Sequence, residues 1–338
     1  MSKSLLVTGG AGFIASNFIH YMLQQYPEYH IINIDKLTYA GTEINLQGAD
    51  ASENYHFIKG DITDEQLIND IFTEYDIDGV IHFAAESHVD RSIKDAKAFI
   101  ESNIMGTSVL LQAARDAWNK KGKLAERRFH HISTDEVYGS LDLETDAKFN
   151  EQTPYDPRNP YSASKAGADM LVKSFGQTYG MNIVISSSSN NYGPRQHPEK
   201  LIPTVISTAL QGKPIPLYGD GKNVRDWLYV DDHCRAIDLI FHHGNALEKY
   251  NVGGSNEKSN IELAMIICDM LDHLKPERQH SHKELITFIG DRKGHDRRYA
   301  VDDRKIRHTL GWKPLTSFET GLHHTVEWYV DQWQKAVL

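Results

Sequence analysis

The chain has 338 residues, of which 40% are apolar and 24% charged, so it has the composition of an ordinary globular protein with one large or two modest domains. Its formal charge of −10 argues against a nucleic-acid or anionic-membrane surface, which needs clustered lysine and arginine. It has two cysteines, Cys234 and Cys268, which exclude a disulfide framework and a cysteine-based metal site. We therefore expect a protein of a reducing cytoplasm.

Targeting and metal-binding signals are also missing from the sequence. The N-terminal apolar run Leu5 to Val7 ends at once in Thr8-Gly9, unlike a signal peptide, and no stretch approaches the roughly 18 apolar residues of a membrane span. The 18 histidines include pairs at 130–131, 242–243 and 323–324, but none has the carboxylate spacing of a zinc enzyme. We expect a cytoplasmic enzyme that binds no metal, no nucleic acid and no membrane.

The chain opens with a strand pattern, a glycine turn and an amphipathic helix. Residues 4–8 are apolar, Gly9 permits a tight turn, and Gly12 lets backbone N–H groups approach a pyrophosphate at the start of the helix. Ala15 allows close packing of helix on strand. This order predicts a dinucleotide-binding unit, although glycines are common in such loops and the motif alone is weak.

A second strand, residues 30–34, ends in Asp35, 20 residues beyond Ala15. A carboxylate there can accept a hydrogen bond from a ribose 2′-hydroxyl and would repel a 2′-phosphate, which favours NAD over NADP. Strand and helix patterns continue to alternate, and this predicts a doubly wound parallel α/β sheet of the Rossmann type. The expected elements are a strand at 57–58 leading to Asp61, a helix at 64–75, a strand at 79–85 and a helix at 98–118.

Two further stretches carry groups suited to catalysis. The strand pattern that starts at His131 ends in the adjacent acids Asp135 and Glu136, and strand ends carry active sites in this architecture. A later helix begins near Tyr161, and Lys165, four residues on, lies on the same face. Taken alone, either motif could equally consist of solvated loop acids or a surface lysine.

The ordered motifs resemble the extended short-chain dehydrogenase/reductase family and, within it, the dTDP-glucose 4,6-dehydratases. The resemblance runs from Leu5 to about Tyr329, and its blocks are Thr8 to Ile14, Asp35 to Gly41, Ala84 to Ile93, Ser133 to Gly139, the Tyr161/Lys165 pair, Ser189 to Pro194, Pro198 to Pro203, Asn223 to Val230, Tyr250 to Gly254, Asn256 to Lys258 and Asp291 to Tyr299.

The resemblance implies site residues at matching positions. Implied cofactor contacts are Gly9, Gly12, Phe13, Asp35, Lys36, Leu37, Thr38, Asp61, Ile62, Ala84, Ala85, Tyr161, Lys165 and Asn191. Implied contacts to the sugar nucleotide are Ser87, Thr134, Asn190, Lys200, Leu201, Pro216, Leu217, Tyr218, Arg225, Asn256 and the segment from Asp291 to His295. The implied domains are an NAD-binding domain of residues 1–191 plus about 232–254, and a smaller α/β substrate-binding lobe of about 192–231 and 255–338.

Some positions depart from the family pattern. Ala15 replaces a third glycine, a serine run fills 186–189, and residues 195–197 replace an aromatic-rich triplet. These positions make the substrate side less certain than the chemistry. On that side Lys200, Arg225 and Arg297 are expected to form a cationic site for a diphosphate, because arginine can bind two oxygens at once.

The resemblance implies a five-residue catalytic set for NAD-dependent removal of water from a nucleotide-linked glucose. Elimination across C5 and C6 needs an acidic C5 proton, so the 4-hydroxyl must first be oxidised. Tyr161 is the expected base for that hydroxyl, with Lys165 and the positive nicotinamide favouring its phenolate and Thr134 positioning the substrate. Glu136 is the expected base at C5 and Asp135 the acid that protonates the departing 6-hydroxyl. Because hydride returns to C6, NAD is expected to stay bound and to be recycled.

Other functions remain open at this point. A 4,6-dehydratase for another nucleotide hexose would share the whole set, whereas a sugar-nucleotide 4-epimerase or simple dehydrogenase would need Tyr161 and Lys165 but not Asp135 and Glu136. A non-catalytic NAD-binding protein would need neither pair. The helices at 98–118 and 161–179 have apolar faces and, by analogy with the family, are expected to form a homodimer.

Overall fold

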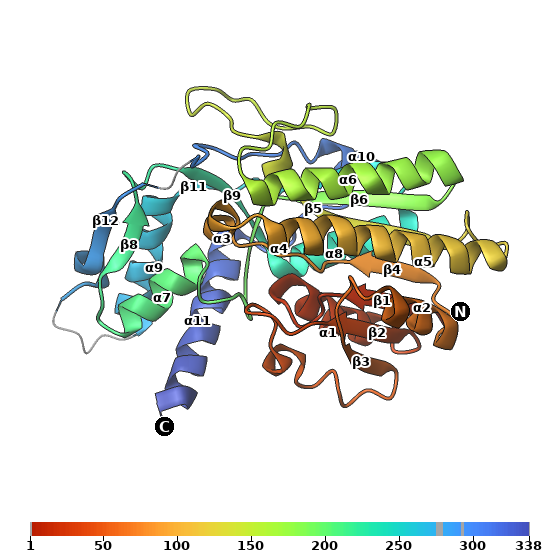
Figure 1. Cartoon of the computed structure of the whole chain (residues 1–338). Helices are drawn as coiled ribbons and strands as arrows, with labels where there is room; N and C mark the ends of the chain where they lie inside the picture. The colour runs from red at the N-terminus through yellow and green to blue at the C-terminus, as the bar shows by residue number, and fades with distance from the viewer. Residues whose placement is uncertain (1, 275–279, 292–293, 338) are drawn as a thin grey trace.

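The structure is a computed structural model that describes residues 2–274, 280–291 and 294–337. Its largest sheet is parallel throughout and lies at the centre of one lobe (Figure 1). In sheet order its strands are β3 (Tyr55–Lys59), β2 (His30–Asp35), β1 (Ser4–Thr8), β4 (Gly79–His82), β5 (Arg128–Thr134), β6 (Asn182–Ser188) and β10 (Lys249–Val252). The predicted doubly wound Rossmann sheet is confirmed.

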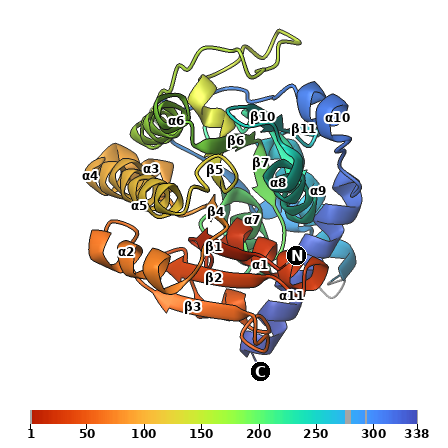
Figure 2. The same cartoon turned by 90° about the vertical axis from the view of Figure 1, so that its right-hand side faces the viewer.

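Helices cover both faces of this sheet, which explains why its strands are apolar on both sides. Figure 2 shows α2, α5 and α6 on one face and α1 and α8 on the other. Their bounds are α1 (Phe13–Gln25), α2 (Glu65–Glu74), α5 (Thr107–Lys120), α6 (Pro160–Tyr179) and α8 (Val230–His243). The chain order reverses at β1, which lies between β2 and β4, and ligands of such sheets bind at the carboxyl ends of the strands beside that point.

The helix expected at 98–118 is a longer and less regular helical run. It consists of α4 (Lys97–Phe99), a π-helical segment (Ile100–Gly106) and α5. Within the π segment the side chain of Asn103 accepts a hydrogen bond from the Glu86 backbone N–H, at 2.8 Å, and donates one to the Ser164 hydroxyl, also at 2.8 Å. These two hydrogen bonds join the π-helical segment to other parts of the chain, and hydrophobic periodicity in the sequence does not reveal them.

A second lobe follows β6 in the chain and lies beside the carboxyl ends of the large sheet (Figure 1). It has a mixed sheet of β11, β9 and β7 and a parallel pair of β12 and β8. Its strands are β7 (Asn190–Tyr192), β8 (Ile215–Tyr218), β9 (Val224–Tyr229), β11 (Glu257–Ser259) and β12 (Ile286–Ile289), and its helices are α7 (Leu201–Leu210), α9 (Asn260–Leu274) and α11 (Phe318–Val337).

The lobe has a hydrophobic core of its own, formed by α7, α9 and α11 against β8 and β9. By contrast α8 and β10 pack with the large sheet, and so does α10 (Arg304–Leu310), whose Ile306 contacts the cluster around Val252. The boundary expected at residue 191 falls inside β7. We therefore keep the two-domain division as a proposal, with the exchange of chain between lobes as its main feature.

Candidate active site

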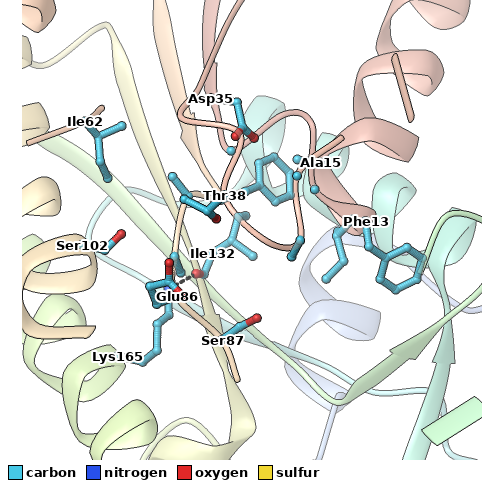
Figure 3. A pocket seen from close by; sticks show the side chains of 18 of the residues that line it. Phe13, Ala15, Asp35, Thr38, Ile62, Glu86, Ser87, Ser102, Ile132 and Lys165 are labelled. Carbon is cyan, nitrogen blue, oxygen red and sulfur yellow. Dashed lines mark hydrogen bonds between the residues drawn. The ribbon is translucent and has the colours of Figure 1, made fainter. Parts of the chain in front are cut away.

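A cavity of about 670 Å³ lies at the carboxyl ends of β1, β2, β4 and β5. The five expected catalytic residues line it together with most of the expected cofactor contacts. Figure 3 shows Phe13, Asp35, Thr38, Ile62 and Lys165 of this lining. The lining contains Gly9, Gly12, Phe13, Asp35, Lys36, Thr38, Asp61, Ile62, Ala84, Ala85, Thr134, Asp135, Glu136, Tyr161, Lys165 and Asn191. The structure thus brings together groups that lie up to 180 residues apart in sequence.

The glycine turn has the geometry that the sequence predicts. Gly9 has a φ of +72°, and a Cβ there would lie 2.7 Å from the Cα of Ala84, so no larger residue fits. Gly12 is the N-cap residue of α1, whose first N–H groups lack side-chain acceptors from the cap. A helix N-terminus of this kind suits a diphosphate. The residues of the glycine turn therefore fit the diphosphate of NAD.

Asp35 is buried at the end of β2, where both of its oxygens accept backbone hydrogen bonds. Oδ1 accepts from the N–H of Leu37 at 2.7 Å, and Oδ2 accepts from the N–H of Ala11 at 2.9 Å. Burial raises the pKa of this carboxyl, and the two hydrogen bonds oppose the rise. Leu37 itself does not line the cavity: it has a φ of +57° and its side chain packs on the hydrophobic cluster of β1 and α1.

Lys36 and Asp61, two of the implied cofactor contacts, form an ion pair with 2.5 Å between Nζ and Oδ2. Burial acts to raise the pKa of Asp61, but the hydrogen bond from Lys36 and those of Thr63 lower it. Figure 3 shows Asp35 and Ile62 toward one end of the cavity and Lys165 toward the other. The cavity is therefore long enough to separate an adenosine end from a reacting end.

The acid pair occupies the turn that follows β5. The chain enters a 3-10 turn (Asp135–Tyr138), and the hydroxyl of Thr134 caps it by accepting the N–H of Glu136 at 3.3 Å. The side chain of Asp135 is buried. Burial raises its pKa well above the ordinary value, and the charges of Glu136 and Asp226 raise it further. A carboxyl whose pKa is raised in this way is suited to holding a proton, as a general acid must.

Tyr161 and Lys165 are placed by the first turn of α6. Asn159 and Ser162 form a capping box there, and Pro160 occupies the first helical position. The ammonium of Lys165 donates a hydrogen bond to the main-chain oxygen of Ile132 at 2.7 Å (Figure 3). Burial lowers the pKa of Lys165 to about 8.

The pKa of Tyr161 differs from the sequence expectation. Burial and the charge of Glu136 raise it, while a hydrogen bond with Thr134 acts to lower it. The charges that raise this pKa come from Glu136 and Asp135, and the ammonium of Lys165 donates its hydrogen bond to the carbonyl of Ile132. Without further positive charge in the cavity, Tyr161 is therefore a neutral phenol at pH 7.

A second cavity of about 330 Å³ adjoins the first on the side of the smaller lobe. The residues lining both cavities are Ser87, Glu136, Asn190, Asn191, Gln196, Glu199 and Lys200. Expected substrate contacts that line the second cavity are Leu201, Pro216, Leu217, Tyr218, Arg225 and His295. Glu136 therefore stands at the junction, where a molecule filling the outer cavity would meet one filling the inner cavity.

Some expected substrate contacts do not line either cavity. The amide of Asn256 donates to the carbonyl of Gly254 at 2.7 Å, and Asp291 pairs with His295 at 2.7 Å. Arg292 and Lys293, inside the expected segment, lie outside the described residues. Sequence similarity marks the segment, but it does not report which side chains turn toward a cavity.

The expected cationic trio is only partly assembled. Lys200 and Arg225 line the second cavity, where Lys200 donates to the carbonyl of Ser87 at 3.2 Å and the guanidinium of Arg225 lies 4.3 Å from the ring centre of Tyr299. Arg297 lines neither cavity and pairs with Asp220 at 3.2 Å. Two cations rather than three therefore face this space from the expected set.

The structure adds residues that the sequence reasoning did not assign. Glu199, His197 and Glu86 line the first cavity and Tyr299 the second. Glu199 lies 3.2 Å from the ring of His88. Its position beside Lys200, inside the matching block Pro198 to Pro203, is the sequence signal that identifies it.

The departures from the family pattern lie close to the cavities. Ser188 and Ser189 line the first, whereas Ser186 is buried 2.9 Å from the ring of His130. Arg195 turns away, with a φ of +70°, and donates to the amide oxygen of Asn17 at 2.8 Å. The serine run therefore contributes to the inner wall, and Arg195 ties the smaller lobe to α1.

Two searches of the described residues bear on other kinds of site. No group of three or more histidine, cysteine, aspartate or glutamate side chains within residues 2–274, 280–291 and 294–337 has the arrangement of a metal site. Within the same ranges, no helix combines the length and apolar character needed to cross a bilayer.

Comparisons with known proteins agree with this geometry. The model of the GDP-mannose 4,6 dehydratase family matches residues 6–325. The dTDP-glucose 4,6-dehydratase of Neisseria gonorrhoeae is 51% identical over 97% of this chain and 96% of its own length. The structure of the same enzyme from Streptomyces venezuelae, solved with NAD bound, has a TM-score of 0.89 at 44% identity and covers 98% of each chain.

A more distant relative shows how far the fold extends. The UDP-glucose 4-epimerase of Thermotoga maritima has a TM-score of 0.84 but is only 28% identical, with 98% of this chain and 99% of that chain covered. The fold is thus shared across different reactions, and the identity is much higher to the dehydratases. The chain therefore belongs to the GDP-mannose 4,6 dehydratase family and, within the extended short-chain dehydrogenase/reductases, to the dTDP-glucose 4,6-dehydratases.

Proposed function

We propose that the protein is a hydro-lyase that converts dTDP-glucose to dTDP-4-keto-6-deoxyglucose with NAD as cofactor, in deoxysugar biosynthesis. The observation that carries the proposal is the buried carboxyl of Asp135 beside Glu136, at the junction of a dinucleotide-sized cavity and an outer cavity. Oxidation alone needs one base. An acid and a second base at the same place suit the removal of water.

The residues divide the reaction between them. Tyr161 takes the proton of the 4-hydroxyl while Thr134 holds that hydroxyl in place. Glu136 then removes the C5 proton, and Asp135 donates a proton to the departing 6-hydroxyl, so that water leaves. NAD, when bound, supplies the hydride acceptor at C4 and returns the hydride at C6.

The cavity explains how Tyr161 becomes a base. Burial and Glu136 keep its proton on in the structure, so a positive charge must enter the cavity before the proton can leave. The nicotinamide ring carries such a charge when it is bound, and Lys165, which lines the same cavity, carries a second one. The basicity of Tyr161 thus depends on the bound cofactor and on the charge of Lys165.

Three properties complete the proposal. NAD stays tightly bound and is recycled, because the reaction has no net redox change. The enzyme works in the cytoplasm, where its two buried cysteines, which form no disulfide, remain reduced. It forms a homodimer through the helical run 97–120 and α6, where Ile100, Met105, Met170 and Tyr179 are exposed by 49%, 54%, 53% and 44%.

The rival reading is a sugar-nucleotide 4-epimerase, which shares the fold and the Tyr161/Lys165 pair. Epimerisation removes no water, so it needs no acid at the position of Asp135. Incubation of the purified protein with dTDP-, UDP-, GDP- and CDP-glucose, followed by detection of the 4-keto-6-deoxy product, tests both substrate and reaction. A 4-epimerised sugar as the main product would replace the proposal, and dehydration of a different nucleotide sugar would correct the base.

A further inference from the structure

A buried polar network lies behind the active site, between α6, β5 and β10. At its centre is Asp169, which is 2% exposed and stands one helical turn after Lys165. Its Oδ2 accepts hydrogen bonds from the hydroxyl of Ser133 at 2.9 Å and that of Tyr155 at 2.6 Å. Its Oδ1 lies 3.3 Å from Nε2 of His131. Neither the sequence reasoning nor the proposed reaction gives Asp169 a role.

The network holds the strand that carries the catalytic acids. Residues 131–133 of β5 are contacted one after another: the first and third side chains by Asp169, and the carbonyl between them by the ammonium of Lys165. Residues 134–136 follow directly. The helix with Tyr161 and the strand end with both acids are therefore joined by one carboxylate and one ammonium.

Asp169 is ionised at neutral pH although it is buried. Burial acts to raise its pKa, but the hydrogen bond with His131 and the charge of Lys249, whose Nζ is 3.7 Å away, outweigh burial and lower the pKa to about 2. His131 is neutral there, because burial and the charge of Lys165 lower its pKa to about 4. The network thus presents a negative charge to the amine of Lys165.

The groups around Lys165 come from several elements. His131 on β5 and His82 on β4 face it and are neutral, since burial lowers the pKa of both rings. Lys249 on β10 is a second buried cation, and burial lowers its pKa to about 8. Against these, the charge of Asp169 opposes the loss of the proton from Lys165.

We propose that Asp169 is a positioning residue: its carboxylate, hydrogen-bonded to the strand that ends in the catalytic acids, sets α6 with Tyr161 and Lys165 against the end of β5. The proposal rests on the proposed function, since it assigns a support to the base of the first step. It predicts that the shape of the side chain and its charge can be separated by substitution.

The test is Asp169→Asn, which retains the shape and an acceptor for Ser133 and Tyr155 but removes the charge. We expect turnover of dTDP-glucose to fall about 10-fold or more, with KM and bound NAD changed less than about 2-fold. The decisive reading is the pH dependence of cofactor reduction in a single turnover, because this step precedes the use of Asp135. The alkaline limb of this pH profile, which reports loss of the proton from Lys165, should move to lower pH by about one unit.

Lys249→Met provides the opposite change and also serves if Asp169→Asn does not fold. Without the Lys249 cation, the negative charge of Asp169 acts more strongly on Lys165 and raises its pKa. The alkaline limb of the pH profile should therefore move to higher pH. Asp70→Asn, at an exposed acceptor on α2 that bonds Gln66 at 2.8 Å, is the matched surface control and should change nothing.

Several outcomes would overturn the proposal. A wild-type turnover and pH profile in Asp169→Asn would remove the positioning role, as would a rise in KM with turnover unchanged. A shift of the Lys249→Met profile in the same direction as Asp169→Asn would remove the role of charge. If the wild type instead acts on a different nucleotide sugar, the proposed substrate fails, and the same comparison with that sugar decides the role of Asp169.

Discussion

Asp135 and Glu136 are adjacent in the 3-10 turn after β5 but lie in different surroundings. Asp135 is 2% exposed and lines the first cavity, whereas Glu136 is half-buried and lines both cavities. The charge of Glu136 is one of the causes that raise the pKa of Asp135. This difference in burial fits the acid role proposed for Asp135 and the base role proposed for Glu136.

This division predicts the effect of pH on Asp135. Its pKa is raised, so the group is protonated and able to donate below that pKa, and the elimination should slow as pH rises through it. Asp135→Asn cannot donate, so we expect turnover to fall about 10²-fold and this part of the pH dependence to vanish. Steady-state rates from pH 6 to pH 10 measure both effects. A variant that kept the wild-type rate would show that Asp135 is not the acid.

Tyr161→Phe tests the first base. The substitution removes one hydroxyl from a packed helix start, so NAD and substrate should bind nearly as in the wild type. We expect turnover to fall at least about 10²-fold, because the positioned base is lost. Bound cofactor after purification and calorimetric titration with dTDP-glucose provide the controls. Wild-type turnover would contradict the assignment.

Glu136→Gln should stop the reaction after the oxidation at C4. The glutamine preserves the size of the side chain but cannot take the C5 proton. We expect the absorbance of the reduced cofactor to rise on addition of substrate, with little 4-keto-6-deoxy sugar formed. If the absorbance does not rise because oxidation at C4 is itself blocked, Glu136 acts at an earlier step of the reaction than proposed.

Isotopic labels follow the same sequence of steps in the wild type. Deuterium placed at C4 of the substrate should reappear at C6 of the product within one molecule, because hydride held on a bound cofactor has no route to another substrate. Product formed in D₂O should carry deuterium at C5, since Glu136 exchanges that proton with solvent. Mass spectrometry of a mixture of labelled and unlabelled substrate measures crossover, which should be absent.

The proposed homodimer predicts the effect of a charge at Met170. Its side chain is 53% exposed on α6, and an arginine there would be buried without a partner in a paired interface. We expect Met170→Arg to be a monomer at micromolar concentration by light scattering. Met265→Arg, at a 44% exposed methionine of α9 outside the proposed interface, is the matched control and should remain dimeric. A monomeric wild type would rule out the homodimer.

The sequence by itself determined the sheet, the glycine turn and the acid at the end of β2, because each depends on local patterns of apolar residues, glycine and strand ends. It also identified Asp135, Glu136, Tyr161 and Lys165 as reactive groups through ordered motifs. Each of these features depends on the residues of one short segment and not on where the folded chain places that segment.

The surroundings of those groups follow from the folded chain. Burial, which depends on segments far apart in sequence, raises the pKa of Asp135. It also places the ammonium of Lys165 on the carbonyl of Ile132 and gathers Ser133, Tyr155 and His131 around Asp169. Such contacts join residues from several elements, and the charge of a buried group depends on all of its neighbours at once, so no local pattern in the sequence could have predicted them.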